Sequence, residues 1–305
     1  MDKILVLGGA GYIGSHVSEL LPVTVFDSLL FEDRFLSPVP FIFGDVKNIE
    51  SLEIVHDFDT LIVLAGIVGD GACAVNPSFT YETNVKHVKW LADNYNGKII
   101  FTSTCSVYGK NDEFLNETSQ TNPLSVYAET KLMAEQYLMN KKPDSLVFRL
   151  GTLYGLSGAY SRPRLDLVVN LLTNKAVKGE TLTVFGGDQW RPLLHVKDVA
   201  EAIKYGIQEN LSGLFNLGDR NETIKSMAEE ILKIIPGNIS YQDIMFEDRR
   251  NYRVDFSKIN STGWRPKHTL TEGIEELANV FKENRIKDCS SPLYNNAHFM
   301  ASFLK

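Results

Sequence analysis

The chain has 305 residues, of which 44% are hydrophobic and 23% are charged, and its formal net charge is −7. This length can bury a substantial core in one large or two modest domains, and the composition is typical of a globular protein. The negative charge disfavours nucleic acid as a general partner, because a phosphate backbone is bound by broad positive surfaces. No run of 18 apolar residues occurs, so we expect no membrane span, no signal peptide and a cytoplasmic location.

The cysteines give no sign of a disulfide framework or a metal site. Cys73, Cys105 and Cys289 are odd in number, far apart and without paired Cys or His ligand spacing. We therefore predict three reduced thiols and no metal.

A glycine-rich turn follows the apolar segment 4–7 directly, with the sequence Gly8-Gly9-Ala10-Gly11-Tyr12-Ile13-Gly14. Gly8 permits a tight turn, Gly11 allows a pyrophosphate to approach the backbone, and Gly14 allows a helix to pack on the strand. The helix N-terminus then presents free N–H groups to two phosphates. Taken alone, the motif fits a dinucleotide site or an ordinary glycine-rich turn.

A second apolar run, 23–26, ends at Asp27, about 20 residues beyond the first glycine. In dinucleotide-binding folds a carboxylate at this position binds the adenosine ribose, so Asp27 predicts NAD. A 2′-phosphate would be repelled there, and the flanking Ser28 and Leu29 provide no arginine to hold it. Before Pro22 there is room for only about two helical turns.

Strand-like runs alternate with helical segments through the first half of the chain, at 4–7, 23–26, 40–43, 60–64, 98–103 and 145–149. This alternation predicts an α/β fold with a doubly wound parallel sheet. Asp45 and the segment 64–66 follow strands and are candidates for the cofactor's edge, although each also fits an ordinary strand exit. We predict a Rossmann-type NAD domain at 1–152 plus about 193–217, and a smaller substrate-binding lobe at 153–192 and 218–305, with a helix near 165–172.

Tyr127 and Lys131 lie four residues apart on a predicted helix introduced by Pro123, so both side chains share one face. A free phenol has a pKa near ~10, and an adjacent ammonium together with an oxidised nicotinamide ring favours the phenolate. Such a tyrosine can take a proton from a sugar hydroxyl while hydride leaves the same carbon. Thr104, after the strand ending at Ser103, could orient the reacting oxygen.

A second Tyr-x-x-x-Lys pair, Tyr137 and Lys141, occurs on the same predicted helix. It lies about 15 Å further along at ~1.5 Å per residue, away from the sheet edge where ligands collect. We therefore predict that Tyr137 has a packing role.

Six segments together resemble the extended short-chain dehydrogenase/reductases of the NAD-dependent nucleotide-sugar epimerase/dehydratase family: 8–14, 103–109, 127–131, 149–155, 190–200 and 215–218. The resemblance covers nearly the whole chain. It implies Thr104, Tyr127 and Lys131 as the catalytic residues. The predicted NAD-binding residues are Gly8, Gly11, Tyr12, Ile13, Gly14, Asp27, Ser28, Asp45, Val46, Leu64, Ala65, Gly66, Asn84, Ser103, Tyr127 and Lys131.

The resemblance also implies a nucleotide-diphosphate sugar as substrate. The predicted contacts are Thr104, Ser106, Thr152, Asn170, Arg191 and Arg250, since guanidinium groups suit phosphate oxygens. Arg162 and Arg164 either join this anionic pocket or hold a loop. Arg249 and Arg253 are expected on the surface, and His195 is expected to be a core histidine.

Departures from the family patterns narrow the expected reaction. The 4,6-dehydratases carry an Asp-Glu pair after the catalytic threonine, where this chain has Cys105 and Ser106, so dehydration is disfavoured. Many 4-epimerases have Asn where this chain has Thr152, which leaves the hexose open. The segments 64–73 and 162–170 resemble a branch that acts on unusual sugars of surface polysaccharides or natural products.

We therefore predict oxidation of the sugar C4 hydroxyl to a 4-keto sugar, by a 4-epimerase or a 4-dehydrogenase. A 4-reductase, a 4,6-dehydratase and a non-catalytic NAD-sensing protein are the alternatives, and the last would be expected to lose the Tyr127 and Lys131 pair. The family leads us to expect a homodimer formed through the helices that carry Asn84 and Tyr127.

Overall fold

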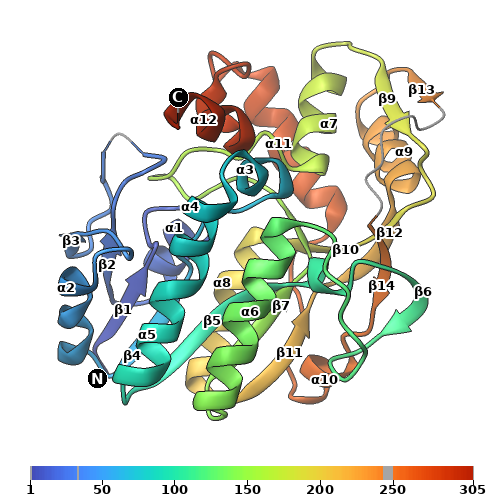
Figure 1. The fold of residues 1–305 in the computed structure, drawn as a ribbon. Helices are drawn as coiled ribbons and strands as arrows, with labels where there is room; N and C mark the ends of the chain where they lie inside the picture. The colour runs from blue at the N-terminus through green and yellow to red at the C-terminus, as the bar shows by residue number, and fades with distance from the viewer. Residues whose placement is uncertain (1, 33, 243–249, 305) are drawn as a thin grey trace.

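A computed structural model describes residues 2–32, 34–242 and 250–304. Its main element is a seven-stranded sheet in the order β11-β7-β5-β4-β1-β2-β3, and every neighbouring pair in it is parallel (Figure 1). These strands are β1 (Ile4–Leu7), β2 (Val23–Asp27), β3 (Phe41–Phe43), β4 (Thr60–Val63), β5 (Lys98–Thr104), β7 (Leu146–Leu150) and β11 (Gly213–Leu217). The predicted doubly wound α/β fold is thus confirmed.

Helices cover both faces of this sheet. Successive residues of β1 alternate between two cores, with Val6 packing among residues of α1 and α8 and Leu5 packing among residues of α5 and α6. The helices of the first half are α1 (Tyr12–Leu20), α2 (Ile49–Leu52), α3 (Asp70–Val75), α4 (Pro77–Tyr81), α5 (His87–Asn94) and α6 (Val126–Lys141), with short helical turns η1 (Glu53–Asp57), η2 (Glu82–Lys86) and η3 (Cys105–Tyr108). As predicted, α1 is short and ends before Pro22.

Smaller sheets lie beyond the seven-stranded one. β8 (Thr152–Tyr154), β10 (Trp190–His195) and β12 (Arg220–Thr223) form one, and the pairs β9 (Leu182–Phe185) with β13 (Ile239–Gln242) and β6 (Lys110–Leu115) with β14 (Asn251–Val254) form two others. The remaining helical elements are α7 (Val168–Val177), α8 (Val196–Gln208), α9 (Ile224–Ile234), α10 (Ser257–Ser261), α11 (Leu270–Lys282), η4 (Pro292–Tyr294) and α12 (Asn296–Phe303).

The helix predicted near 165–172 begins later, at Val168. Leu165 donates its main-chain N–H to the carbonyl of Tyr294, and the flanking Arg164 pairs with Asp166, so these residues are held in a loop. This non-local pairing could not be read from the local hydrophobic pattern.

A buried ion pair fixes helix α6 to the sheet. The guanidinium of Arg149 on β7 binds the Glu135 carboxylate of α6 at 2.5 to 3.1 Å, and both side chains are about 95% or more buried. Arg149 also donates to the Tyr108 hydroxyl at 2.9 Å, which in turn donates to Asn216 on β11 at 2.7 Å. Burial alone would lower the pKa of Arg149, but the bonds to Glu135 raise it above its ordinary value. One network therefore joins α6, η3, β7 and β11.

Glu135→Ala should lower the free energy of unfolding by about 3–5 kcal/mol, because it leaves a buried guanidinium without its counter-charge. Urea denaturation measures this loss. The control is Glu129→Ala, which removes an exposed carboxylate from the same helix and should change stability by less than about 0.5 kcal/mol. Equal effects of the two variants would contradict the role given to the ion pair.

Candidate active site

The glycine turn after β1 has the space that a dinucleotide diphosphate needs. Gly8 has a φ of +84°, and a Cβ atom there would lie 2.6 Å from the main-chain nitrogen of Ala65. At Gly14 a Cβ would lie 2.5 Å from Gly9. At Gly11 the nearest protein atom is 3.5 Å away, so packing of the chain does not explain that glycine. No side chain caps the N-terminus of α1 and no acid lies in its first turn, which suits a phosphate.

The neighbouring helix residues face the protein. The Tyr12 hydroxyl donates to the Gly155 carbonyl at 2.7 Å, and Ile13 packs against the core. If these residues contact the cofactor, they do so through the main chain.

Asp27 is the last residue of β2, at the carboxyl edge of the sheet. Its two carboxylate oxygens accept the N–H groups of Ala10 and Leu29 at 3.0 and 2.8 Å, and burial raises the pKa of the carboxyl group. Each oxygen keeps a lone pair for a ribose hydroxyl. Asp45 follows β3 and accepts from the Lys47 N–H, while Val46 is buried beside it.

The segment Leu64 to Gly66 continues from β4 beside Gly8, because Ala65 donates to the Leu7 carbonyl at 2.8 Å. Ile67, the residue after this segment, is held by the buried Asn84 of η2. The Asn84 side-chain oxygen accepts from the N–H of Ile67, and its NH2 group donates to the carbonyl of Ile67 and to Thr130. Asn84 therefore shapes this loop and ties it to α6.

The three predicted catalytic residues come together at this edge of the sheet. Thr104 is the last residue of β5, and Tyr127 and Lys131 lie one turn apart on α6, whose N-cap is Ser125. The Thr104 side chain lies beside the Tyr127 phenol. Burial raises the pKa of this phenol, and the neighbouring Thr104 side chain opposes the rise. Nearby, the buried Ser103 hydroxyl finds no hydrogen-bond partner among the described residues.

The Lys131 ammonium lies in an apolar environment. Its Nζ lies 4.5 Å from the centre of the Phe101 ring, the residue is 4% exposed, and burial lowers the pKa of the amine to about 8. Keeping this amine charged therefore costs the folded protein free energy, because burial disfavours the ammonium form. A ligand whose hydroxyl oxygens accept hydrogen bonds from the ammonium would relieve that cost.

The predicted substrate residues lie on several elements. Arg191 of β10 is buried and donates to the carbonyls of Trp190 and Arg250. Asn170 of α7 is buried and bonds to the main chain of Gly155 and Arg164. Thr152 begins β8. As they stand, Arg191 and Asn170 hold the loops of the lobe together.

Two residues that sequence reasoning missed join this set. The Ser106 hydroxyl lies 3.3 Å from the hydroxyl of Tyr252 on β14. Asp70, the first residue of α3, accepts from Ser125 at 2.7 Å and pairs with the Arg250 guanidinium at 2.9 Å. The Asp70 charge also contributes to raising the pKa of the Tyr127 phenol. The position of Asp70 just after the loop that follows β4 was the sequence signal that could have identified it.

Other predicted residues take structural roles. The hydroxyl of Tyr137 donates to Asp93 of α5 at 2.7 Å, which confirms its packing role. His195 is buried and its ring stacks on His268, as expected for a core histidine. Arg253 donates to the Asp112 carbonyl. Arg249 lies outside the described residues.

Arg162 and Arg164 both hold loops, one of the two roles considered for them. Arg162 donates to the Leu293 carbonyl at 2.6 Å, and Arg164 forms two hydrogen bonds with Asp166. Arg162 thus fastens the segment after β8 to the C-terminal part of the chain, whereas Arg164 holds its own segment together.

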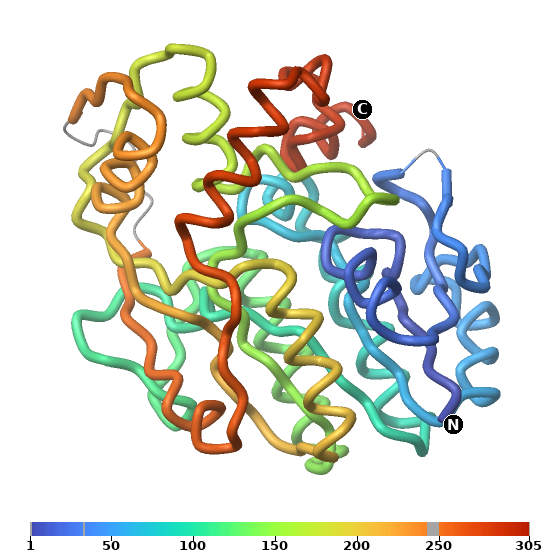
Figure 2. The backbone as a smooth tube through the Cα atoms, turned by 180° about the vertical axis from the view of Figure 1, so that it is seen from behind, coloured from blue at the N-terminus to red at the C-terminus, as the bar shows by residue number. Residues whose placement is uncertain are grey.

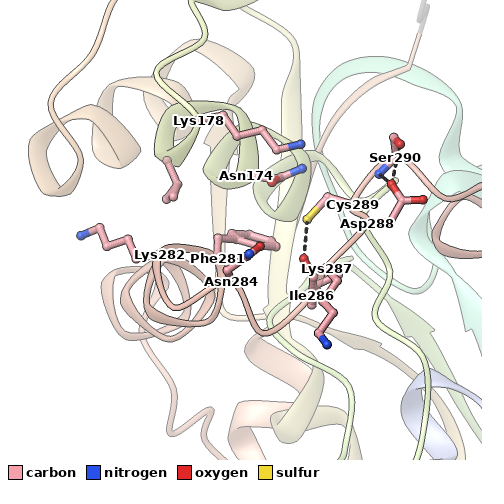
Figure 3. Close-up of a pocket in the computed structure, with 11 residues that line it drawn as sticks. Asn174, Lys178, Phe281, Lys282, Asn284, Ile286, Lys287, Asp288, Cys289 and Ser290 are labelled. Carbon is pink, nitrogen blue, oxygen red and sulfur yellow. Dashed lines mark hydrogen bonds between the residues drawn. The ribbon is translucent and has the colours of Figure 1, made fainter.

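A cavity of about 480 Å³ lies away from these residues, between α7, the end of α11 and residues 284–290 (Figure 3). Its wall includes Asn174, Lys178 and Cys289, and no predicted site residue lines it. Among the described residues no helix is long and apolar enough to cross a membrane, and no group of three His, Cys, Asp or Glu side chains could hold a metal ion.

Comparison with known proteins agrees with this geometry. Residues 4–218 match the family model described as NAD dependent epimerase/dehydratase family. The chain belongs to that family. It is therefore an NAD-dependent enzyme of the extended short-chain dehydrogenase/reductase type, and NAD is its cofactor.

The relatives carry several activities. A putative UDP-glucose 4-epimerase of Methanocaldococcus jannaschii is 26% identical, with 92% of this chain and 99% of that protein covered. UDP-glucuronic acid decarboxylase 6 of Arabidopsis thaliana is 27% identical, with 92% and 89% covered. The crystal structure of UDP-glucose 4-epimerase with UDP-glucose from Thermotoga maritima superposes with a TM-score of 0.81 at 26% identity, covering 93% of this chain and 99% of that one.

Lys131→Met should stabilise the cofactor-free protein at pH 7 by roughly 1–3 kcal/mol. The amine has a lower pKa in the folded than in the unfolded chain, so the unfolded state binds the proton more tightly. The cost of burying the charge is complete below pH about 8 and vanishes as pH rises toward 10.5. Denaturation curves at pH 7 and 10 test this: the gain should shrink at pH 10, and a constant gain would assign it to packing.

Proposed function

We propose that this enzyme is a nucleotide-diphosphate-sugar 4-epimerase that works through a 4-keto sugar. The observation that carries the proposal is that Thr104 and the Tyr127 and Lys131 pair of α6 lie at the same carboxyl edge of the parallel sheet as the glycine turn after β1 and Asp27 at the end of β2. NAD, when bound, would supply the hydride acceptor and donor that reaction at C4 requires. The relatives named as 4-epimerases support the choice of reaction.

In this mechanism Tyr127 accepts the proton of the C4 hydroxyl as the C–H bond breaks, and returns a proton to the oxygen when the keto group is reduced. Thr104, which lies beside the phenol, holds the reacting oxygen in line. The Lys131 ammonium favours the phenolate electrostatically. For the sugar nucleotide we propose contacts with Ser106, Thr152, Asn170, Arg191 and Arg250.

The surroundings of Tyr127 disfavour 4,6-dehydration as the reaction and a uronic acid as the substrate. Cys105 stands at one dehydratase carboxylate position, and its thiol is buried and bonded to the Arg149 carbonyl, so it cannot serve as an acid at the sugar. A uronic acid would bring a carboxylate toward Asp70, whose charge acts on the phenol. The Arg164 guanidinium, a positive charge that acts on Tyr127, is paired with Asp166. We therefore propose a neutral hexose as the substrate class.

Purified protein should be incubated with UDP-, GDP-, CDP- and dTDP-hexoses and followed for new sugar isomers and for reduced nicotinamide. Isomers without accumulation of reduced cofactor indicate an epimerase. Release of the keto sugar with stoichiometric reduced cofactor would indicate a 4-dehydrogenase instead.

The location and assembly of the enzyme are proposals too. We propose a cytoplasmic enzyme of polysaccharide or natural-product biosynthesis that forms a homodimer through α5 and α6. Helix α6 leaves Met133 43% exposed, which supports an interface there. Size-exclusion chromatography with light scattering tests it, and a monomer at micromolar concentration would exclude it.

Tyr127→Phe should reduce kcat at least 1,000-fold and leave NAD affinity within about threefold, because the hydroxyl acts on the proton and not on the cofactor's affinity. Steady-state kinetics and NADH fluorescence measure the two quantities. Tyr137→Phe is the matched control from the second Tyr-x-x-x-Lys pair, and it should retain activity. Equal activity of the two variants would contradict the mechanism.

Asp70→Asn should tighten the binding of UDP about two- to fivefold, because the Asp70 carboxylate competes with the diphosphate for Arg250. The amide keeps an oxygen that can accept from Ser125. Calorimetric titration with UDP measures the change, and Glu129→Gln, which removes a charge from the exposed side of α6, should leave affinity unaltered. Weaker UDP binding in Asp70→Asn would show that the carboxylate itself contributes to the site.

A further inference from the structure

The C-terminal segment, residues 291–304, lies at the same edge of the main sheet as the catalytic residues. Both views place α12 beside α3 on the side opposite the N-terminus, which is where the strands of the main sheet end (Figures 1 and 2). The contact is close, since a Cβ atom at Gly71 would lie 3.1 Å from Ala297. The family model ends at residue 218, so this segment lies outside the part of the chain that defines the family.

Asn296 is the centre of the polar contacts made by this segment. Asn296 is 3% exposed. Its side-chain NH2 group donates to the Val68 carbonyl in the loop after β4 at 2.9 Å, and its side-chain oxygen accepts from Arg162. The Asn296 main-chain N–H donates to Asp166 at 3.1 Å. One side chain thus joins the loop after β4 to the segment after β8.

Apolar contacts extend the same attachment in both directions. Phe299 packs against Phe31, in the loop after Asp27, with ring centres 4.9 Å apart. Met300 is 1% exposed and belongs to a cluster that includes Cys73 and the partly buried Tyr127. Segment 291–304 therefore reaches from the loop that follows β2 to the start of α6.

The guanidinium of Arg162 completes the connection. It lies 4.6 Å from the centre of the Phe31 ring, while the main-chain N–H of Arg162 donates to Glu32. Burial raises the pKa of Glu32 to about 7, and the side chains of Arg162 and Glu32 are only 8% and 12% exposed. The ends of β2 and β4 and the catalytic helix are thus joined through one C-terminal element.

These three places carry residues predicted to bind NAD, which are Asp27 and Ser28 at the end of β2, the segment 64–66 after β4, and Tyr127 and Lys131 on α6. We propose that segment 291–304 acts as a clamp that keeps NAD bound, with Asn296 as its positioning residue. Opening the loops after β2 and β4 requires breaking the contacts of Asn296 and Phe299. The clamp slows cofactor release without touching the reacting atoms.

Such a clamp suits an isomerisation, in which the reduced cofactor must remain until the hydride returns. This part of the inference rests on the proposed 4-epimerase function, whereas cofactor retention does not. A test of retention alone can therefore be separated from a test of turnover.

The test measures the release of NADH from loaded full-length protein after mixing with excess NAD, followed by nicotinamide fluorescence. Asn296→Ala should release NADH at least tenfold faster than the unmodified protein. Asn296→Asp keeps an acceptor for Arg162 but loses the donor to Val68, and it should give an intermediate rate. Ser302→Ala, on the exposed side of α12, is the control and should release NADH at the unmodified rate.

A chain ending at Ser290 should release NADH at least as fast as Asn296→Ala. If that shorter chain does not fold, the point variants still decide the question. A lower melting temperature of Asn296→Ala with unchanged NADH release would overturn the proposal and leave a structural role only. Fast release in the unmodified protein, equal to that of the variant, would overturn it as well. Absence of sugar turnover with slow NADH release would reject the proposed function but not the clamp.

Discussion

The buried ion pair between Arg149 and Glu135 is the constraint on which the geometry of the site depends. The proposed mechanism needs a hydroxyl from the end of β5 and two side chains from α6 to act on one substrate oxygen. Hydrophobic packing alone allows a helix to slide or rotate on a sheet at little cost, whereas a buried charge pair with fixed donor directions does not. Because the same guanidinium bonds to Tyr108 in η3, the position of α6 and the exit of β5 are set together.

The electrostatics of the site are unfavourable in the protein alone. Burial raises the pKa of the Tyr127 phenol and lowers that of the Lys131 amine, so each group is pushed away from the ionised form that proton transfer uses. The structure holds both side chains in place despite this cost, which is common where a site is built for a ligand. In the proposed mechanism the hydroxyls and the positive ring of bound NAD would supply the missing compensation, which would link binding to activation.

Much of this arrangement could be predicted from local sequence patterns. The glycine turn, the alternating apolar runs and the spacing of Tyr127 and Lys131 depend on neighbouring residues, and the first strand was predicted to the residue. Asp70, Tyr252 and Asn296 were missed because their significance comes from partners far along the chain; Asn296 and Val68, for example, are separated by 228 positions. The helix placed near 165–172 was displaced for the same reason, since a distant carbonyl holds Leu165 outside it.

The two ends of the chain differ in what can be joined to them. Lys3 precedes β1 at the amino edge of the sheet, whereas α12 lies over the carboxyl edge beside α3 (Figure 1). A purification tag or fusion partner appended after α12 would begin beside the cluster that contains Tyr127, and its bulk would compete with the packing of Phe299 and Met300. The same addition before β1 would begin on the far side of the sheet, so amino-terminal fusions are the ones suited to kinetic work.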